Sequence, residues 1–238
     1  MEIIKDKNVL IVGATGGIGK ATALLLKQSG ANLFVTSSNE SKLAELSTLL
    51  DLPSHQTFLL DITDANAVKK VSDSIHQQIT AIDILINAAG IGIIKPIENL
   101  SEQDFMQTVQ VNLAGAFYLV KNFIEPMKIA KKGLIINIPG VLGKTPMAGA
   151  AAYSASKYGL NGMMKSIREE LKRTDIRITN IFLGGTDSAF WDHIDLRVQR
   201  DKFVQASEVA KSIWFLCQQP SSGVVSELVL QPFNHQAI

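Results

Sequence analysis

The sequence of 238 residues predicts a doubly wound α/β fold, in which about seven parallel strands form one sheet with helices on both faces. Two observations predict it. Short apolar runs alternate along the chain with segments whose apolar residues recur at helical spacing, as in parallel sheets with right-handed crossovers. The first apolar run also ends in a glycine-rich turn, at the edge where ligands of such sheets bind.

Each expected strand is a short run rich in apolar residues. The first, "NVLIVGA", is continuously apolar, as expected of a parallel strand that is covered on both faces. The expected strands are residues 8–14, 32–38, 57–61, 82–90, 133–138, 177–184 and 226–230.

The segments between these runs have helical periodicity. The expected helices are residues 19–30, which end at Gly30, then 41–50, 64–78 and 104–123, one that begins near Tyr153 and one around Cys217. No linker or low-complexity stretch interrupts them, so residues 1–238 are expected to form a single dinucleotide-binding domain.

Composition excludes several classes of function. A net charge of +1 leaves no basic stripe for nucleic acid, and no apolar run is long enough to span a membrane. The single cysteine, Cys217, lies on an apolar helical pattern and is expected in the core. No secretory leader is recognisable, so we expect a cytoplasmic protein. The four histidines are scattered without ligand spacing, and no metal is expected.

The glycine-rich turn "GATGGIG" follows the first strand and opens the first helix. Gly13, Gly17 and Gly19 lack a Cβ, so backbone N–H groups can approach a pyrophosphate at the positive end of the helix. Dinucleotide binding is therefore favoured over a simple tight turn.

Tyr153 and Lys157 stand four residues apart among small residues and would share one helix face. On their own they favour an ordinary helix start with a half-buried tyrosine and a solvated lysine. The remaining motifs decide between these interpretations.

Over essentially its whole length the sequence resembles the short-chain dehydrogenase/reductase family. The resemblance rests on six motifs in family order: "GATGGIG", "DIT", "NAAG", "VNLAG", "YSASK" and "GGTDSAFW". It implies a Rossmann fold and an NAD(P)-dependent oxidoreductase that acts on a small-molecule carbonyl or alcohol.

The resemblance also implies roles for individual residues. Tyr153 would be the general acid/base, and Lys157 would favour its phenolate and hold the nicotinamide ribose. Asn112 would kink its helix and hold a water that links Lys157 to solvent. The implied cofactor-binding residues are Gly13, Thr15, Gly17, Ile18, Gly19, Ser37, Ser38, Asp61, Ile62, Asn87, Ala88, Gly90, Tyr153, Lys157 and Thr186.

The chain departs from the family pattern at two glycines. Gly140 stands where the family has a serine that orients the substrate carbonyl, and Gly184 stands where it usually has proline. Losing such a donor costs on the order of 10²- to 10³-fold in rate. Thr145, a water or a substrate hydroxyl could replace it, and Gly140→Ser is expected to restore it. At Gly184 we expect only a looser loop. The alternative function is a catalytically impaired NAD(P)-binding protein that acts as a redox sensor or interaction module.

Cofactor preference depends on Ser37 and Ser38 at the end of the second strand. The acid that would exclude NADP is absent, and serine hydroxyls can bond a 2′-phosphate, so NADP(H) is preferred and NAD(H) remains possible.

The segment after Thr186 is expected to form a lid in which Phe190 and Trp191 either face an apolar substrate or pack onto the body. The helix over 104–123 and the Tyr153 helix carry extra apolar residues, and the resemblance implies that they pair with their copies in a homodimer or homotetramer. These residues are Phe117, Tyr118, Met163 and Met164.

Overall fold

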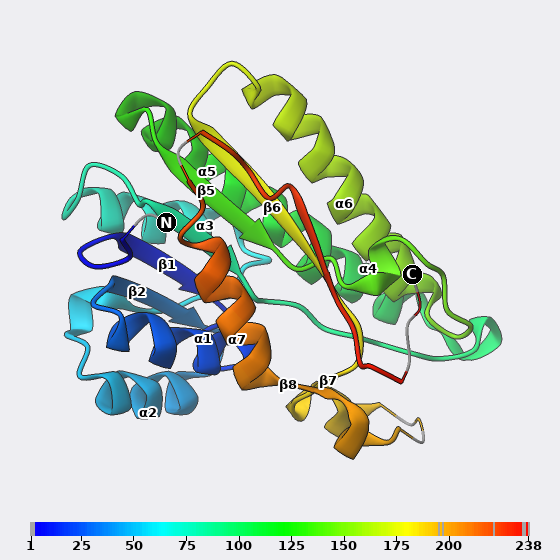
Figure 1. Cartoon of the computed structure of the whole chain (residues 1–238). Helices are drawn as coiled ribbons and strands as arrows, with labels where there is room; N and C mark the ends of the chain where they lie inside the picture. Colours follow the sequence, from blue (N-terminus) through cyan, green and yellow to red (C-terminus); the bar gives the residue numbers. More distant parts are fainter. Residues whose placement is uncertain (1–2, 195, 197, 221, 235–236, 238) are drawn as a thin grey trace.

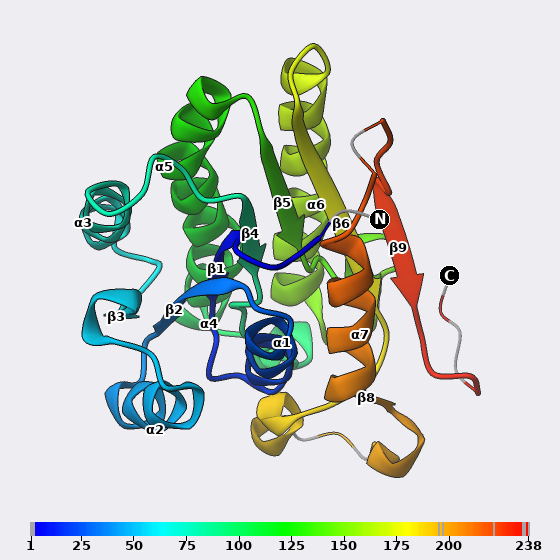
Figure 2. The same cartoon turned by 60° about the vertical axis from the view of Figure 1, so that its left-hand side comes forward.

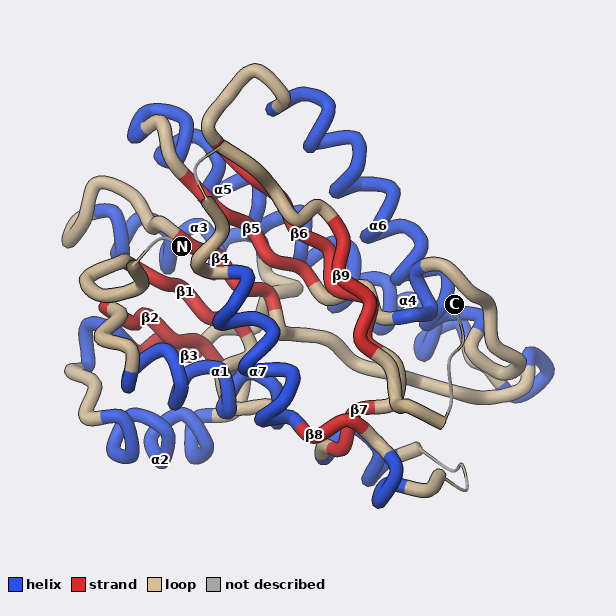
Figure 3. The backbone as a smooth tube through the Cα atoms, in the orientation of Figure 1, coloured by secondary structure: helices blue, strands red, loops and turns tan. Residues whose placement is uncertain are grey.

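The computed structural model describes residues 3–194, 196, 198–220, 222–234 and 237. Its centre is a seven-stranded parallel sheet in the order β3-β2-β1-β4-β5-β6-β9, drawn in red in Figure 3. The strands are β1 (Asn8–Val12), β2 (Asn32–Ser37), β3 (Thr57–Leu59), β4 (Ile84–Asn87), β5 (Gly133–Asn137), β6 (Ile176–Leu183) and β9 (Glu227–Leu230). The predicted doubly wound fold is confirmed.

Helices cover both faces of this sheet (Figures 1 and 2). One face carries α1 (Gly17–Gln28), α2 (Glu40–Leu50) and α7 (Ala206–Leu216). The other carries α3 (Ala65–His76), α4 (Glu102–Val109), α5 (Gly115–Ala130) and α6 (Ala151–Leu171). Among the helices described, none is both long and apolar enough to cross a membrane.

The strands read as continuous apolar runs because both of their faces are buried. In β4, Ile84 and Ile86 pack under α1, α2 and α7, whereas Leu85 points to the opposite core. Cys217, at the end of α7, is 3% exposed and belongs to the first core, as predicted.

The helix expected over residues 104–123 is interrupted. A π-helical segment, η3 (Gln110–Ala114), separates α4 from α5, and Asn112 lies within it. The resemblance implied a kink at Asn112, whereas the helical periodicity of the sequence showed no sign of this wider turn, a feature often found at functional sites. The short 3₁₀ segments are η1 (Ser54–Gln56), η2 (Ile97–Asn99) and η4 (Val141–Gly143).

Two segments extend past the carboxyl ends of the strands. The lid, residues 186–205, contains β7 (Thr186–Asp187), η5 (Ala189–His193), η6 (Arg200–Lys202) and β8 (Val204–Gln205). β7 and β8 form a second, two-stranded parallel sheet that the sequence pattern did not predict. The C-terminal segment after β9 runs towards this lid (Figure 1).

Candidate active site

A cavity of about 890 Å³ opens at the carboxyl ends of the central strands. Some of the predicted site residues line it: Gly17, Ile18, Gly19, Ala88, Gly90, Tyr153, Lys157 and Thr186. The other predicted residues are not among those that line it: Gly13, Thr15, Ser37, Ser38, Asp61, Ile62, Asn87 and Asn112. The fold therefore brings four of the six motifs, "GATGGIG", "NAAG", "YSASK" and "GGTDSAFW", to one hollow.

The glycine-rich turn leaves the amino end of α1 open. Gly16, before the helix, offers no side-chain cap, so the first N–H groups of α1 have no partner within the helix. A Cβ on Gly19 would lie 2.2 Å from the carbonyl oxygen of Gly13, so the turn can close this tightly only with glycine. An anion that enters the cavity would meet these N–H groups.

Tyr153 and Lys157 occupy the first turns of α6 and share one face, as predicted. The Lys157 Nζ lies 5.5 Å from the centre of the Tyr153 ring and donates to the Ile138 carbonyl at 3.0 Å. Burial lowers the pKa of Lys157 to about 8 and raises the pKa of Tyr153 above its ordinary value. Lys157 is thus still protonated at neutral pH, although burial disfavours its charge.

Asn112 ties three elements together. Its Oδ1 accepts from the Ile91 N–H at 2.9 Å, and its Nδ2 donates to the Ile91 carbonyl at 2.9 Å and to the Ser156 Oγ at 3.0 Å. Ser156 in turn donates to the Tyr153 carbonyl at 2.8 Å. These bonds connect η3, the loop after β4 and the first turns of α6.

The side chains of Asn112 and Lys157 converge at Gly90. A Cβ on Gly90 would lie 3.1 Å from Asn112 Oδ1 and 3.3 Å from Lys157 Nζ. Sequence reasoning did not identify the link from Ser156 to Asn112. The backbone partners, at Ile91 and Ile138, carry no residue-type signal at all.

Gly140 has φ 69° and ψ 172°, a backbone conformation that is essentially restricted to glycine. A serine placed there would strain the chain, so the expectation that Gly140→Ser simply restores a hydroxyl must be revised. Thr145 does not replace that hydroxyl either, because its Oγ1 donates to the Ala237 carbonyl at 3.3 Å.

The end of β2 also differs from the simplest expectation. Ser37 is 4% exposed, and its Oγ is hydrogen-bonded to Thr15 Oγ1 at 2.6 Å and to the Asn39 N–H at 3.0 Å. Of the two serines, Ser38 is the exposed one. Ser37 therefore anchors the glycine-rich turn to β2, and Ser38 is the hydroxyl available to a ligand.

Aromatic side chains join the lid to the catalytic tyrosine candidate. The Phe190 ring centre lies 5.8 Å from that of Tyr153, and Trp191 packs between Phe190 at 5.3 Å and Phe203 at 5.1 Å. Phe190 and Trp191 both line the cavity and also pack within the lid, so both expected interpretations apply.

Arg200 links the parts of the lid. It forms ion pairs with Asp187 at 2.7 Å and with Asp192 at 2.6 Å, and it donates to the Ser188 carbonyl at 3.0 Å. The sequence offered no indication of this contact set, because the residues have no regular spacing.

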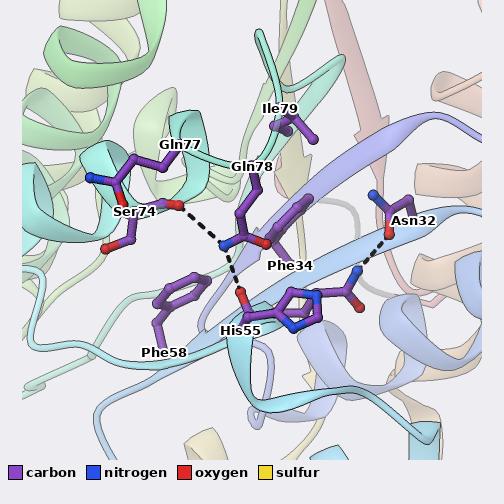
Figure 4. Close-up of a pocket in the computed structure, with 9 residues that line it drawn as sticks. Asn32, Phe34, His55, Phe58, Ser74, Gln77, Gln78 and Ile79 are labelled. Carbon is purple, nitrogen blue, oxygen red and sulfur yellow. Dashed lines mark hydrogen bonds between the residues drawn. The ribbon is translucent and has the colours of Figure 1, made fainter.

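A second hollow of about 670 Å³ lies at the amino ends of β2 and β3 (Figure 4). Much of its polar lining is already paired: Gln78 donates to the carbonyls of His55 and Ser74, and Gln56 donates to Asn32. It lies at the opposite ends of the strands from the larger cavity. No group of three or more potential metal ligands occurs within the described part of the chain.

Comparisons with known proteins agree with this geometry. A family model described as short chain dehydrogenase matches residues 7–198. The 3-oxoacyl-(acyl-carrier-protein) reductase FabG of Thermotoga maritima is 30% identical over 236 residues, covering 95% of this chain and 96% of the relative. An uncharacterised oxidoreductase of Staphylococcus epidermidis is 27% identical over 232 residues, covering 98% of this chain and all of the relative.

Solved structures give the same result. A metagenomic short-chain oxidoreductase in complex with NADP has a TM-score of 0.84 and 26% identity, covering 97% of this chain and 99% of that chain. Serine dehydrogenase of Escherichia coli has a TM-score of 0.86 over 96% of this chain and 99% of that chain, and at 24% identity it shows a likeness of fold.

Proposed function

The chain belongs to the short-chain dehydrogenase family of oxidoreductases, and on that premise we propose that it transfers a hydride between NADP(H) and a small carbonyl compound or secondary alcohol. The observation that carries the proposal is that Tyr153 and Lys157 line one cavity with the glycine-rich turn, while Asn112 meets Lys157 at Gly90. A metagenomic relative in complex with NADP supports the choice of cofactor.

The residues present fit a dinucleotide. The open amino end of α1 offers N–H groups to a pyrophosphate, and glycine at position 19 keeps that turn tight. Asp61 Oδ1 accepts hydrogen bonds from the Thr63 N–H and the Thr63 hydroxyl, which leaves Oδ2 to accept one from an adenine amine. When bound, the reduced nicotinamide supplies the hydride, and in the reverse direction the oxidised nicotinamide accepts it.

In the direction of reduction, Tyr153 gives its phenolic proton to the carbonyl oxygen while the carbonyl carbon gains the hydride. The product is a secondary alcohol, and Tyr153 becomes a phenolate. Lys157, with its pKa near 8, is protonated at neutral pH and stabilises that phenolate. Asn112 fixes the loop after β4 against α6 and keeps this pair aligned.

The alternative is a binding protein with impaired catalysis. Gly140 favours it, since this position carries no donor for the carbonyl oxygen and its backbone conformation disfavours any side chain. Retention of Tyr153, Lys157 and Asn112 favours the enzyme.

The test is NADPH oxidation with a panel of ketones and aldehydes, together with NADP⁺ reduction with alcohols. We expect turnover by the wild type, and we expect Tyr153→Phe to lower it by about 10²-fold or more. Calorimetry should find NADPH affinity nearly unchanged in this variant, because the phenol acts on the substrate. Tight NADPH binding without turnover on any substrate would instead support the binding protein.

Cofactor preference follows from the end of β2. We propose that NADPH binds more tightly than NADH, because no carboxylate opposes a 2′-phosphate there. Because Ser37 is buried, the informative substitution is Ser38→Asp, which places an acid at the exposed position. Calorimetry should show the order reversed in this variant; tighter binding of NADH by the wild type would contradict the proposal.

We further propose a homodimer or homotetramer in the cytoplasm. Phe105, Met106 and Phe117 expose apolar surface around the α4–α5 junction, with 39%, 51% and 44% of each residue accessible. Two of the residues expected on this surface are not exposed. Met164 is fully buried in the core, and Tyr118 is partly buried against it.

A further inference from the structure

The two glycines that depart from the family pattern are neighbours in space. The Gly140 N–H donates to the Ile181 carbonyl at 3.2 Å, and a Cβ on Gly140 would lie 3.4 Å from the carbonyl oxygen of Leu183. Gly184 follows directly, and both glycines line the same cavity. One structural cause can therefore account for both departures.

Gly184 is the point at which the C-terminal segment reaches the sheet. A Cβ on Gly184 would lie 2.8 Å from Pro232 Cδ and 3.2 Å from Gln231 Cα, both closer than a real side chain allows without movement. The Gly184 N–H also donates to the Leu230 carbonyl at 2.9 Å. The expected looser loop is wrong: glycine here permits close packing of the C-terminal segment.

That segment forms a wall of the cavity. Gln231, Pro232, Asn234 and Ala237 line the same hollow as Tyr153. The segment is fastened to the loop after Gly140, since the Thr145 hydroxyl donates to the Ala237 carbonyl. It therefore encloses the part of the cavity that lies over Gly140, where a serine side chain is missing.

We propose that this wall and Gly140 form a distal subsite for a bulky, uncharged, apolar substituent of the substrate. The proposal rests on the proposed function, since it concerns the same cavity. The lining includes the apolar Leu142, Leu196, Val198 and Pro232; its charged members are Lys157 and Lys202, and none of the described lining residues is acidic. The preferred substrates are ketones or secondary alcohols in which one substituent is far larger than methyl.

The test compares acetophenone with butan-2-one. Gly184→Ala should push Pro232 and Gln231 out of place, and it should lower kcat/KM for acetophenone by about tenfold or more while that for butan-2-one stays within about twofold. The matched control is Gly223→Ala, whose Cβ would lie 3.8 Å from Pro220 Cγ, an ordinary contact. This control should leave kcat/KM unchanged for both ketones.

A second variant guards against misfolding. Asn234→Trp alters an exposed lining residue and narrows the subsite, so it should discriminate against acetophenone in the same way. Calorimetric binding of acetophenone to the NADP⁺-loaded protein provides a readout that needs no turnover, and both variants should weaken it by about tenfold or more.

The outcomes separate this inference from the proposed function. The subsite would be overturned if the variants lowered kcat/KM equally for the two ketones. It would also be overturned if both variants left kcat/KM and binding of acetophenone unchanged. A wild type that turns over neither ketone, yet binds acetophenone more tightly than the variants do, would keep the subsite and reject the oxidoreductase. A wild type that neither binds nor reduces acetophenone would overturn the subsite as well.

Discussion

Among single residues, Lys157 is one whose buried charge serves the site but lowers the free energy of unfolding. It is 5% exposed and holds its charge in an apolar setting, with the Ile138 carbonyl as its hydrogen-bond partner. Between its folded pKa of about 8 and its ordinary value of 10.5, the unfolded chain holds more protons than the native protein. The wild-type free energy of unfolding therefore gains from this group as pH rises through that window.

We predict that Lys157→Met abolishes turnover but raises the free energy of unfolding at pH 7. The gain is at most about 3 kcal/mol, since the shift in pKa corresponds to that much and the Ile138 bond is lost. It should shrink as pH rises from about 8 towards 10.5. Urea denaturation across this pH range measures it. A difference in the free energy of unfolding between Lys157→Met and the wild type that grows with pH would contradict this prediction.

Gly140 adds a second residue-scale prediction. Because its φ of 69° and ψ of 172° belong to glycine, Gly140→Ser should lower the free energy of unfolding by about 1 to 3 kcal/mol and leave kcat/KM no higher. Gly162→Ala is the control: its Cβ would meet nothing within 4 Å in the middle of α6, so it should stabilise by about 0.5 to 1 kcal/mol. A faster and equally stable Gly140→Ser would show that the loop can rearrange around a serine.

At the scale of elements, the lid depends on contacts between residues that are distant in the chain. Phe190 reaches Tyr153 only while residues 188–192 keep their position, and Arg200 holds them through Asp187, Asp192 and the Ser188 carbonyl. These charges are exposed, so salt should screen them.

We therefore predict that Arg200→Gln raises KM by about threefold to tenfold and changes kcat less, because the lid closes over substrate less often. The wild-type KM should rise with salt, and that of the variant should rise less. Steady-state kinetics at low and high salt measure both effects. The control is Arg173→Gln, at an exposed position after α6, which should leave KM unchanged. An unchanged KM in Arg200→Gln would show that the Arg200 contacts do not control the lid.

For the whole molecule, the proposed assembly can be tested at the exposed apolar surface around the α4–α5 junction. Light scattering at micromolar concentration should find a dimer or tetramer, and Phe117→Lys should shift it towards the monomer, since a charge would be buried at the interface. Ile129→Lys, at the far end of α5 and 70% exposed, is the control and should leave the assembly intact. A wild-type monomer would contradict the assembly.

The sheet, its parallel strands and the helices on both faces could all be predicted from the sequence. These depend on local periodicity, on continuous apolar strands and on glycine at the first turn, all of which a single chain displays. The sequence also determined that Tyr153 and Lys157 share a face, because four residues along a helix bring side chains together wherever the helix lies.

The surroundings of those residues could not be predicted, because they depend on how distant elements pack. The link from Asn112 through Ser156 to Tyr153, the Arg200 contacts and the packing of Pro232 on Gly184 join residues with no regular spacing. The tertiary structure also reversed two interpretations, since Ser37 is buried and Gly184 is tightly packed. Backbone carbonyls and close approaches of main chain leave no residue-type pattern, so these features follow from how the elements pack together.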